Sequence, residues 1–139
     1  MTTDYYAVRA KTIVEEMVVT ELQYKKIQAG EDLVQYTLVY QEGEVVKKSD
    51  ATNPNLMPAL GLANQTVTSG VQGDVIIRGR VNNPNWSWTS GAALFASTTP
   101  GEMTETPPTA SGYVSQRVAT ALTQKLIELN PFQHYIIGE

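Results

Sequence analysis

The chain has 139 residues and a mass of 15.2 kDa, which is the size of one domain. Hydrophobic residues make up 42% of it and charged residues 17%, so a packed core is expected and disorder of the whole chain is excluded. The net charge of −4 comes without any cluster of Lys or Arg, which argues against nucleic acid as a partner.

The residue types that carry much enzyme chemistry are scarce. Cysteine is absent and His134 is the single histidine, which excludes disulfides, Cys-ligated metal sites and thiol catalysis. We therefore predict no cofactor and no metal site. No apolar run approaches the roughly 18 residues of a membrane-spanning helix, and the N-terminal sequence lacks the pattern of a signal peptide. The sequence predicts a soluble, non-secreted domain with no membrane partner.

Residues 1–30 differ in pattern from the rest and are expected to form an N-terminal arm, or extension, before a β-rich domain at 31–139. Residues 8–28 contain no Gly or Pro, and their apolar residues fall close to the spacing of one helical face. We favour a helix, but the β-branched residues and an alternating pattern over 14–24 keep a strand as the alternative. The apolar stripe needs a surface to cover it, on its own domain, a sister subunit or a partner. Its residues are Ile13, Val14, Met17, Val18 and Leu22.

From residue 33 onward, short runs rich in β-formers alternate with turn residues, which predicts an all-β fold, a small β-sandwich or tulip-like barrel. Gln41-Glu42-Gly43 is a hairpin signal between the first two runs. A helix over 113–129 is the one dissenting interpretation. Strands are predicted at 33–40, 44–48, 59–63, 74–81, 92–98, 113–123, 125–129 and 133–137.

Trp86 and Trp88 lie two residues apart in a loop rich in Asn, Pro, Ser and Thr, so in an extended loop both rings face the same side. We interpret the pair first as a cap over one open end of the β core. An anchor for a partner protein and a platform for a sugar are the alternatives. Arg78 and Arg80 share one strand face and are expected to pair with acidic neighbours.

Two groups of side chains could suggest catalysis. Glu15-Glu16 and the pair Glu102 and Glu105 could supply carboxylates for glycoside hydrolysis, and His134 could serve Ser111 or Ser115 as a base. Catalytic groups must be held rigidly, and no nucleophile motif or rigid support is evident around these residues. We therefore interpret them as surface groups and predict no catalytic residue.

An ordered set of motifs runs through the β-rich region. It resembles the small β domains of tailed-bacteriophage virions, chiefly the capsid decoration (cement) proteins, with related modules in phage tail fibres. The resemblance covers about residues 30–131, and the Trp86-Ser87-Trp88 loop is not among its motifs. The motifs are PALGLA (58–63), VQGDVIIRGRV (71–81), GAALFASTTPGEMT (91–104), PPTA (107–110), VSQRVATAL (114–122) and LNP (129–131).

The resemblance implies a non-enzymatic virion structural protein, a homotrimer on the outer capsid surface, assembled in the host cytoplasm. It implies binding where subunits of the major capsid protein meet, through an N-terminal arm or an edge strand, and stabilisation of the head by bridging them. Deleting residues 1–29 is then expected to leave a folded β domain. The alternatives are a tail-fibre or baseplate module that recognises a host surface glycan through Trp86 and Trp88, and a small polysaccharide hydrolase.

Overall fold

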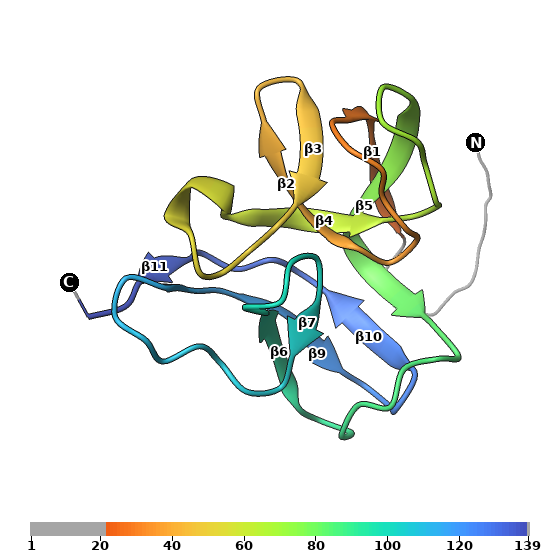
Figure 1. Cartoon of the computed structure of the whole chain (residues 1–139). Coiled ribbons are helices and arrows are strands. Elements are labelled where there is room, and N and C mark those ends of the chain that lie inside the picture. The colour runs from red at the N-terminus through yellow and green to blue at the C-terminus, as the bar shows by residue number, and fades with distance from the viewer. Residues whose placement is uncertain (1–21, 139) are drawn as a thin grey trace.

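The structure is a computed structural model that describes residues 22–138, and this part of the chain is almost entirely β-structure without an α-helix (Figure 1). The all-β prediction is confirmed. The helical interpretation of 113–129 is wrong because that segment forms strands at Val114–Ser115, Arg117–Ala121 and Leu126–Leu129. A short 3-10 turn, η2 (Pro54–Leu56), interrupts the strands. The strands are β1 (Gln23–Ala29), β2 (Leu38–Glu42), β3 (Val45–Lys48), β4 (Ala59–Ala63), β5 (Gln72–Asn82), β6 (Ala93–Ala96), β7 (Met103–Thr104), β8 (Val114–Ser115), β9 (Arg117–Ala121), β10 (Leu126–Leu129) and β11 (Tyr135–Ile136).

Five strands form a small closed barrel. β1 pairs with β3 in parallel, and the pairs β3–β2, β2–β4, β4–β5 and β5–β1 are antiparallel, so the ring closes on itself. The predicted hairpin is present between β2 and β3, where Glu42 pairs with Val45. β4 and β5 approach closely at Gly61, where a Cβ would lie 2.0 Å from the carbonyl oxygen of Ile76. Only glycine fits that position without moving the backbone.

Side chains that alternate along the strands fill the barrel and also cover one of its outer faces. Every barrel strand contributes to a buried interior cluster of Ile27, Ala29, Leu33, Val39, Val46, Ala63 and Val75. The residues next to three of these along the strands, Leu38, Leu62 and Ile76, are equally buried but belong to a different cluster. Because successive side chains of a strand point to opposite faces, these three lie outside the barrel. The barrel therefore needs a second layer against that face.

β5 connects the barrel to that second layer. It pairs with β1 as far as Arg78 and with β10 from Gly79 to Asn82. Gly79 has a φ of 125°, which a residue with a Cβ adopts only under strain. Glycine thus lets one strand turn out of the barrel into a second sheet, ordered β5-β10-β9-β6-β7, which lies below the barrel in Figure 1.

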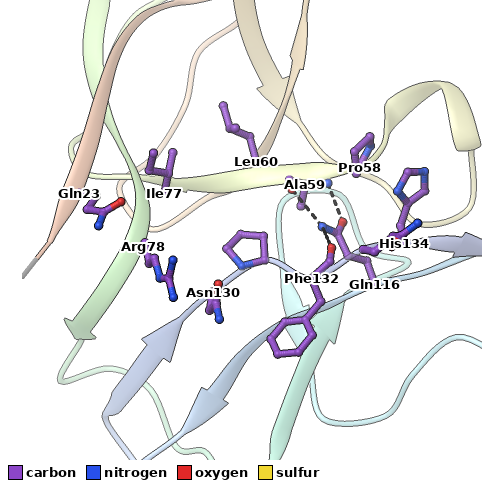
Figure 2. Close-up of a pocket in the computed structure, with 12 residues that line it drawn as sticks. Gln23, Pro58, Ala59, Leu60, Ile77, Arg78, Gln116, Asn130, Phe132 and His134 are labelled. Carbon is purple, nitrogen blue, oxygen red and sulfur yellow. Dashed lines mark hydrogen bonds between the residues drawn. The ribbon is translucent and has the colours of Figure 1, made fainter. Parts of the chain in front are cut away.

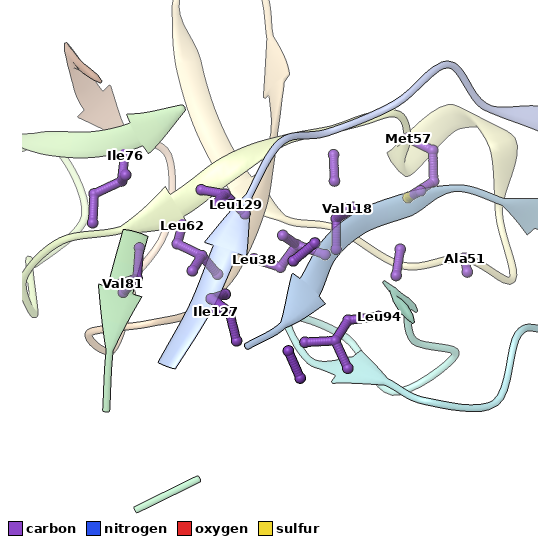
Figure 3. Close-up of a cluster of buried hydrophobic side chains, with 14 of the residues drawn as sticks. Leu38, Ala51, Met57, Leu62, Ile76, Val81, Leu94, Val118, Ile127 and Leu129 are labelled. Atoms are coloured by element: carbon purple, nitrogen blue, oxygen red, sulfur yellow. The ribbon is translucent and has the colours of Figure 1, made fainter. Parts of the chain in front are cut away.

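The main core lies between the outer face of the barrel and the second sheet (Figure 3). Burying one aliphatic side chain contributes about 1.5–3 kcal/mol, so a shared core of this size holds the two layers together as one body. Its large, nearly inaccessible members come from both layers and from β8, and they are Leu38, Leu62, Ile76, Leu94, Val114, Val118, Ile127 and Leu129.

The N-terminal segment departs from the favoured prediction where the structure describes it. Gln23–Ala29 is strand β1, so a helix is wrong for residues 23–28 and the alternative strand is confirmed there. The reason is tertiary: Ile27 and Ala29 alternate into the barrel interior while Lys26 and Gln28 remain exposed. Residue 30, the expected end of the arm, follows a barrel strand directly. Deleting residues 1–29 would remove β1 and open the barrel, contrary to the expectation of a folded remainder. Residues 8–21 lie outside the described part of the chain.

Several strand boundaries differ from the prediction by a few residues, and one short strand was not predicted. The strand expected over 33–40 begins at Leu38, and its first residues form a turn in which the N–H of Thr37 donates to the carbonyl of Val34 at 3.1 Å. Met103 and Thr104, expected in a loop, form β7 by pairing with β6. The first difference comes from the local turn at 34–37, and the second from pairing with the neighbouring strand β6.

Candidate functional site

Trp86 and Trp88 lie in the loop between β5 and β6, and this loop is held in place. The N–H of Trp86 donates to the carbonyl of Asn83 at 3.0 Å, and the N–H of Trp88 donates to the carbonyl of Gln124, also at 3.0 Å. The ammonium of Lys125 donates to the carbonyl of Trp86 at 2.8 Å. The loop is therefore bound to the turn between β9 and β10.

The rings of Tyr36, Trp86 and Trp88 form one aromatic cluster. The ring centroids lie 5.4 Å apart for Tyr36 and Trp86 and 6.1 Å apart for Trp86 and Trp88, with the planes tilted by 57° and 50°. Aromatic pairs favour such separations, because offset or edge-on contacts match their charge distribution. All three side chains are partly buried and pack against the main core.

The aromatic cluster borders a cavity of about 350 Å³, which we call the aromatic cavity. Its polar lining comes from Gln35, Thr37, Asn83 and Glu102, and Met103 adds an apolar contact. This volume falls in the range of small-molecule sites, about 300–1,000 Å³. Aromatic faces and a few polar side chains thus meet in one concave surface.

Trp88 contributes an unsatisfied donor at this site. Its Nε1 is buried and finds no acceptor among residues 22–138. A buried donor without a partner costs about 1–3 kcal/mol. The indole therefore has a bonding requirement that the described part of the chain leaves unmet.

Tyr36 lines the cavity, and its backbone has a strained conformation. Its φ of 74° is the one positive value at a non-glycine position between residues 22 and 138. The ring contact with Trp86 and the hydroxyl, which donates to the carbonyl of Asn82 at 3.2 Å, hold it there. A bulky residue in this region costs about 1–3 kcal/mol and persists only where its surroundings impose the conformation. Tertiary contacts thus fix the first wall of the cavity.

A second hollow, of about 460 Å³, lies where the C-terminal segment passes the barrel (Figure 2), and we call it the C-terminal groove. Pro58, Leu60, Ile77 and Phe132 supply its apolar lining. Arg78 and His134, from β5 and from the segment before β11, also line it.

The buried amide of Gln116 holds this groove together. Its Oε1 accepts from the N–H of Ala59 at 2.7 Å, and its Nε2 donates to the carbonyls of Ala59 at 3.1 Å and Phe132 at 3.0 Å (Figure 2). The amide thus bonds both the N–H and the carbonyl of Ala59 at the start of β4, as a neighbouring strand would. Left unpaired and buried, these backbone groups would destabilise the fold. The amide also fixes Phe132 relative to the barrel.

The C-terminal segment exposes three large apolar side chains, which we call the apolar C-terminal face. Phe132 is 49% exposed, Tyr135 64% and Ile136 43%. The guanidinium of Arg117 lies 5.4 Å from the centroid of the Phe132 ring. The sequence pattern predicts a strand here but no interface. The signal that could have indicated one is the set of three large apolar residues close behind Asn130-Pro131.

The candidate carboxylates do not form a pair suited to hydrolysis. Glu105 accepts from the N–H of Thr89 at 2.6 Å, so it anchors the tryptophan loop. Glu102 is exposed and lines the aromatic cavity. Glu15 and Glu16 lie outside the described residues.

His134 and the two serines also have separate surroundings. His134 is exposed in the C-terminal groove, and within residues 22–138 no hydrogen bond joins it to either serine. The hydroxyl of Ser111 donates to the carbonyl of Gly138 at 3.2 Å. Ser115 is buried and pairs with Tyr135 in the β8–β11 ladder.

Among the titratable groups of residues 22–138, Tyr40 and Glu42 are the two whose pKa values are shifted. The Tyr40 hydroxyl donates to the Glu42 carboxylate at 2.7 Å. Burial raises the pKa of Tyr40 to about 12, and the hydrogen bond to Glu42 contributes in the same direction. The same bond lowers the pKa of Glu42, with a further contribution from Lys47, whose ammonium is 3.6 Å away. These groups stabilise the β2–β3 hairpin.

Arg78 and Arg80 were predicted to pair with acidic neighbours, and the structure shows such a pair for Arg80. Arg80 forms an ion pair with Glu128 across β5 and β10 at 3.7 Å. Arg78 lines the C-terminal groove.

Of the predicted apolar stripe, the structure describes Leu22, which is partly buried against the main core. Ile13, Val14, Met17 and Val18 lie outside the described residues. Residues 22–138 contain no group of three or more potential metal-ligating side chains and no helix long and apolar enough to cross a membrane.

Comparison with models of protein families and with the sequences of curated proteins finds no match to this chain.

Proposed function

We propose that the chain is a non-enzymatic structural protein of a tailed-bacteriophage virion that decorates the outer surface of the head. It would act as a homotrimer that bridges subunits of the major capsid protein. The resemblance of residues 30–131 to decoration proteins motivates the proposal. The observation that carries it is the apolar C-terminal face, because large exposed apolar side chains in one segment are typical of protein-binding surfaces.

The geometry of this face suits a protein partner. Tyr135 and Ile136 lie on β11, a strand that within residues 22–138 pairs only with β8. Its other edge can accept a strand from a partner, which would add main-chain hydrogen bonds to the apolar contacts. Gln116 and the barrel hold the adjoining Phe132 segment in place, so little ordering entropy is lost on binding.

Bridging several coat subunits would stabilise the head through many modest contacts. A trimer that engages three equivalent sites gains avidity on the order of 10²–10⁴ over one contact. Because it binds the assembled shell and not the separated subunits, its binding energy is added to the stability of the shell.

The test is binding of the full chain to expanded heads that lack it. The variant Tyr135→Ser/Ile136→Ser should reduce head occupancy at least roughly tenfold, since central apolar anchors each contribute more than about 1 kcal/mol. The matched control is Val34→Ser/Val71→Ser, which removes side chains that are 65% and 51% exposed elsewhere on the surface. It should leave occupancy unchanged.

Circular dichroism should show that both variants keep the β-fold. Failure of the unmodified chain to bind heads would contradict the proposal. Equal head occupancy for the two double variants would show that the apolar C-terminal face is not the surface that binds the head.

A further inference from the structure

The geometry of the aromatic cavity points to a binding site for a neutral saccharide. This inference goes beyond the proposed function, since sugar binding here does not depend on attachment to a head. The cavity and the apolar C-terminal face also have separate sets of lining residues.

The aromatic side of the cavity matches the apolar side of a sugar ring. The faces of a pyranose that carry C–H groups pack on aromatic rings, and Tyr36, Trp86 and Trp88 offer three such rings in contact. The rings are held from behind by the main core and by the loop bonds of Trp86 and Trp88. A preformed platform of this kind loses little entropy when a ligand binds.

The polar side of the cavity supplies partners for sugar hydroxyls. The side chain of Gln35 uses its Nε2 on the carbonyl of Asn64, at 3.0 Å, and Asn83 uses its Oδ1 on the N–H of Asn85, also at 3.0 Å. Each amide thus keeps its other end for a ligand. The carboxylate of Glu102 makes no hydrogen bond or ion pair that involves another residue of 22–138, so it can accept from two hydroxyls.

Charge selects the class of saccharide. Glu102 is the one ionised group among the described residues that line the cavity, and the lining contains no Lys or Arg. A carboxylate repels an anionic sugar, whereas it forms charge-assisted hydrogen bonds with the hydroxyls of a neutral one. The cavity should therefore discriminate against uronic and sialic acids.

Two further features fit a ligand site. The strained φ of Tyr36 lies at this cavity, and functional sites are where such strain accumulates. The Nε1 of Trp88 lacks an acceptor among the described residues, and a sugar hydroxyl could supply one if the indole turned slightly. Binding should then change the environment of Trp88.

The experiment uses tryptophan fluorescence of the full chain, because both of its tryptophans line the cavity. The probes are methyl mannoside, glucose, galactose and N-acetylglucosamine, with glucuronic acid and N-acetylneuraminic acid as the anionic set. At least one neutral sugar should change the emission saturably, with matching heat in calorimetry. The anionic sugars should bind more weakly.

Glu102→Gln should weaken binding of the neutral sugar about tenfold, since one charge-assisted hydrogen bond becomes a neutral one. It should also reduce the discrimination against anionic sugars, which a merely structural role would not do. Glu44→Gln is the matched control, because Glu44 is an exposed acid in the β2–β3 turn, outside the cavity, and this variant should bind as the unmodified chain does. Trp86→Ala should abolish binding. If that variant does not fold, Trp86→Phe takes its place; it keeps an aromatic ring and should retain part of the binding.

Three results would overturn the inference. The first is no saturable change with any neutral sugar at tens of millimolar. The second is equal or tighter binding of the anionic sugars. The third is the same affinity for Glu102→Gln and Glu44→Gln.

Discussion

Tyr36 holds a backbone conformation that its own side chain disfavours. It is the third residue of a four-residue turn closed by the hydrogen bond from Thr37 to Val34, and φ at this position is 74°. Glycine adopts such a conformation freely, whereas any residue with a Cβ is strained there. The tyrosine is retained because its ring packs on Trp86 and its hydroxyl bonds to Asn82.

Two substitutions separate the strain from the ring contact. Tyr36→Ala loses the ring and keeps the strain, whereas Tyr36→Gly loses the ring and relieves the strain. The glycine variant should therefore be more stable than the alanine variant by about 1 kcal/mol, measured by urea denaturation. An alanine variant at least as stable as the glycine variant would show that the turn does not impose the strain.

The shifted pKa of Tyr40 makes the stability of the chain depend on pH. Its pKa of about 12 lies above the ordinary value of 10.0, so the folded state keeps the proton that the unfolded state releases. The stabilisation is complete below pH 10 and is lost as the pH rises to about 12. For Glu42 the shift is downward, so its contribution is present above its ordinary pKa and is lost as the pH falls through the lowered value.

Ultraviolet absorbance of tyrosinate tests this behaviour directly. A titration of the folded chain should contain one tyrosine that ionises near pH 12, and that step should be absent in Tyr40→Phe. Tyr24→Phe, which removes a tyrosine that is 49% exposed, should leave the step in place. Persistence of the late step in Tyr40→Phe would assign it to another residue.

At the scale of elements, β1 closes the barrel. It pairs with both β3 and β5, and it places Ile27 and Ala29 in the barrel interior. Without β1 the barrel would have two open edges, and its interior would lose the apolar contacts of that strand. Open strand edges also favour aggregation.

Two truncations test this role of β1. Deletion of residues 1–21 should preserve a cooperative thermal transition, because it leaves β1 complete. Deletion of residues 1–29 should abolish the transition or cause aggregation, since it removes β1. Thermal unfolding followed by circular dichroism and light scattering distinguishes these outcomes. A folded, monodisperse product of the longer deletion would mean that the remaining four strands close by themselves.

At the scale of the whole molecule, two layers share one core and leave the apolar C-terminal face outside it. Analytical ultracentrifugation of the full chain at micromolar concentration should give the mass of a trimer, as the proposed decoration role requires for multivalent attachment. A monomer at that concentration would contradict a preformed trimer. Retention of the trimer in Tyr135→Ser/Ile136→Ser would place the trimer contact elsewhere and leave this face for the coat.

The sequence also predicted where turns interrupt the chain. Gly43 marked the hairpin between β2 and β3, the segment 59–63 matched β4 to the residue, and Asn130-Pro131 marked the end of β10. These features depend on local backbone preferences and on alternation along a strand, so they can be inferred without knowing the partner strands. The aromatic pair was likewise visible because both tryptophans share one loop.

Composition and local pattern by themselves determined that this protein is a β-rich domain and that Trp86 and Trp88 share one loop between strands. Tertiary structure alone decided that Gln23–Ala29 is a strand, that Tyr36 completes the aromatic cluster, and that Gln116 ties the C-terminal segment to the barrel. The physical reason is that each of these depends on groups at least 16 residues away in sequence, as in the bonds of Gln116 to Phe132 and to Ala59. Local preference is weak at such positions, and the energy of the distant contact determines the conformation.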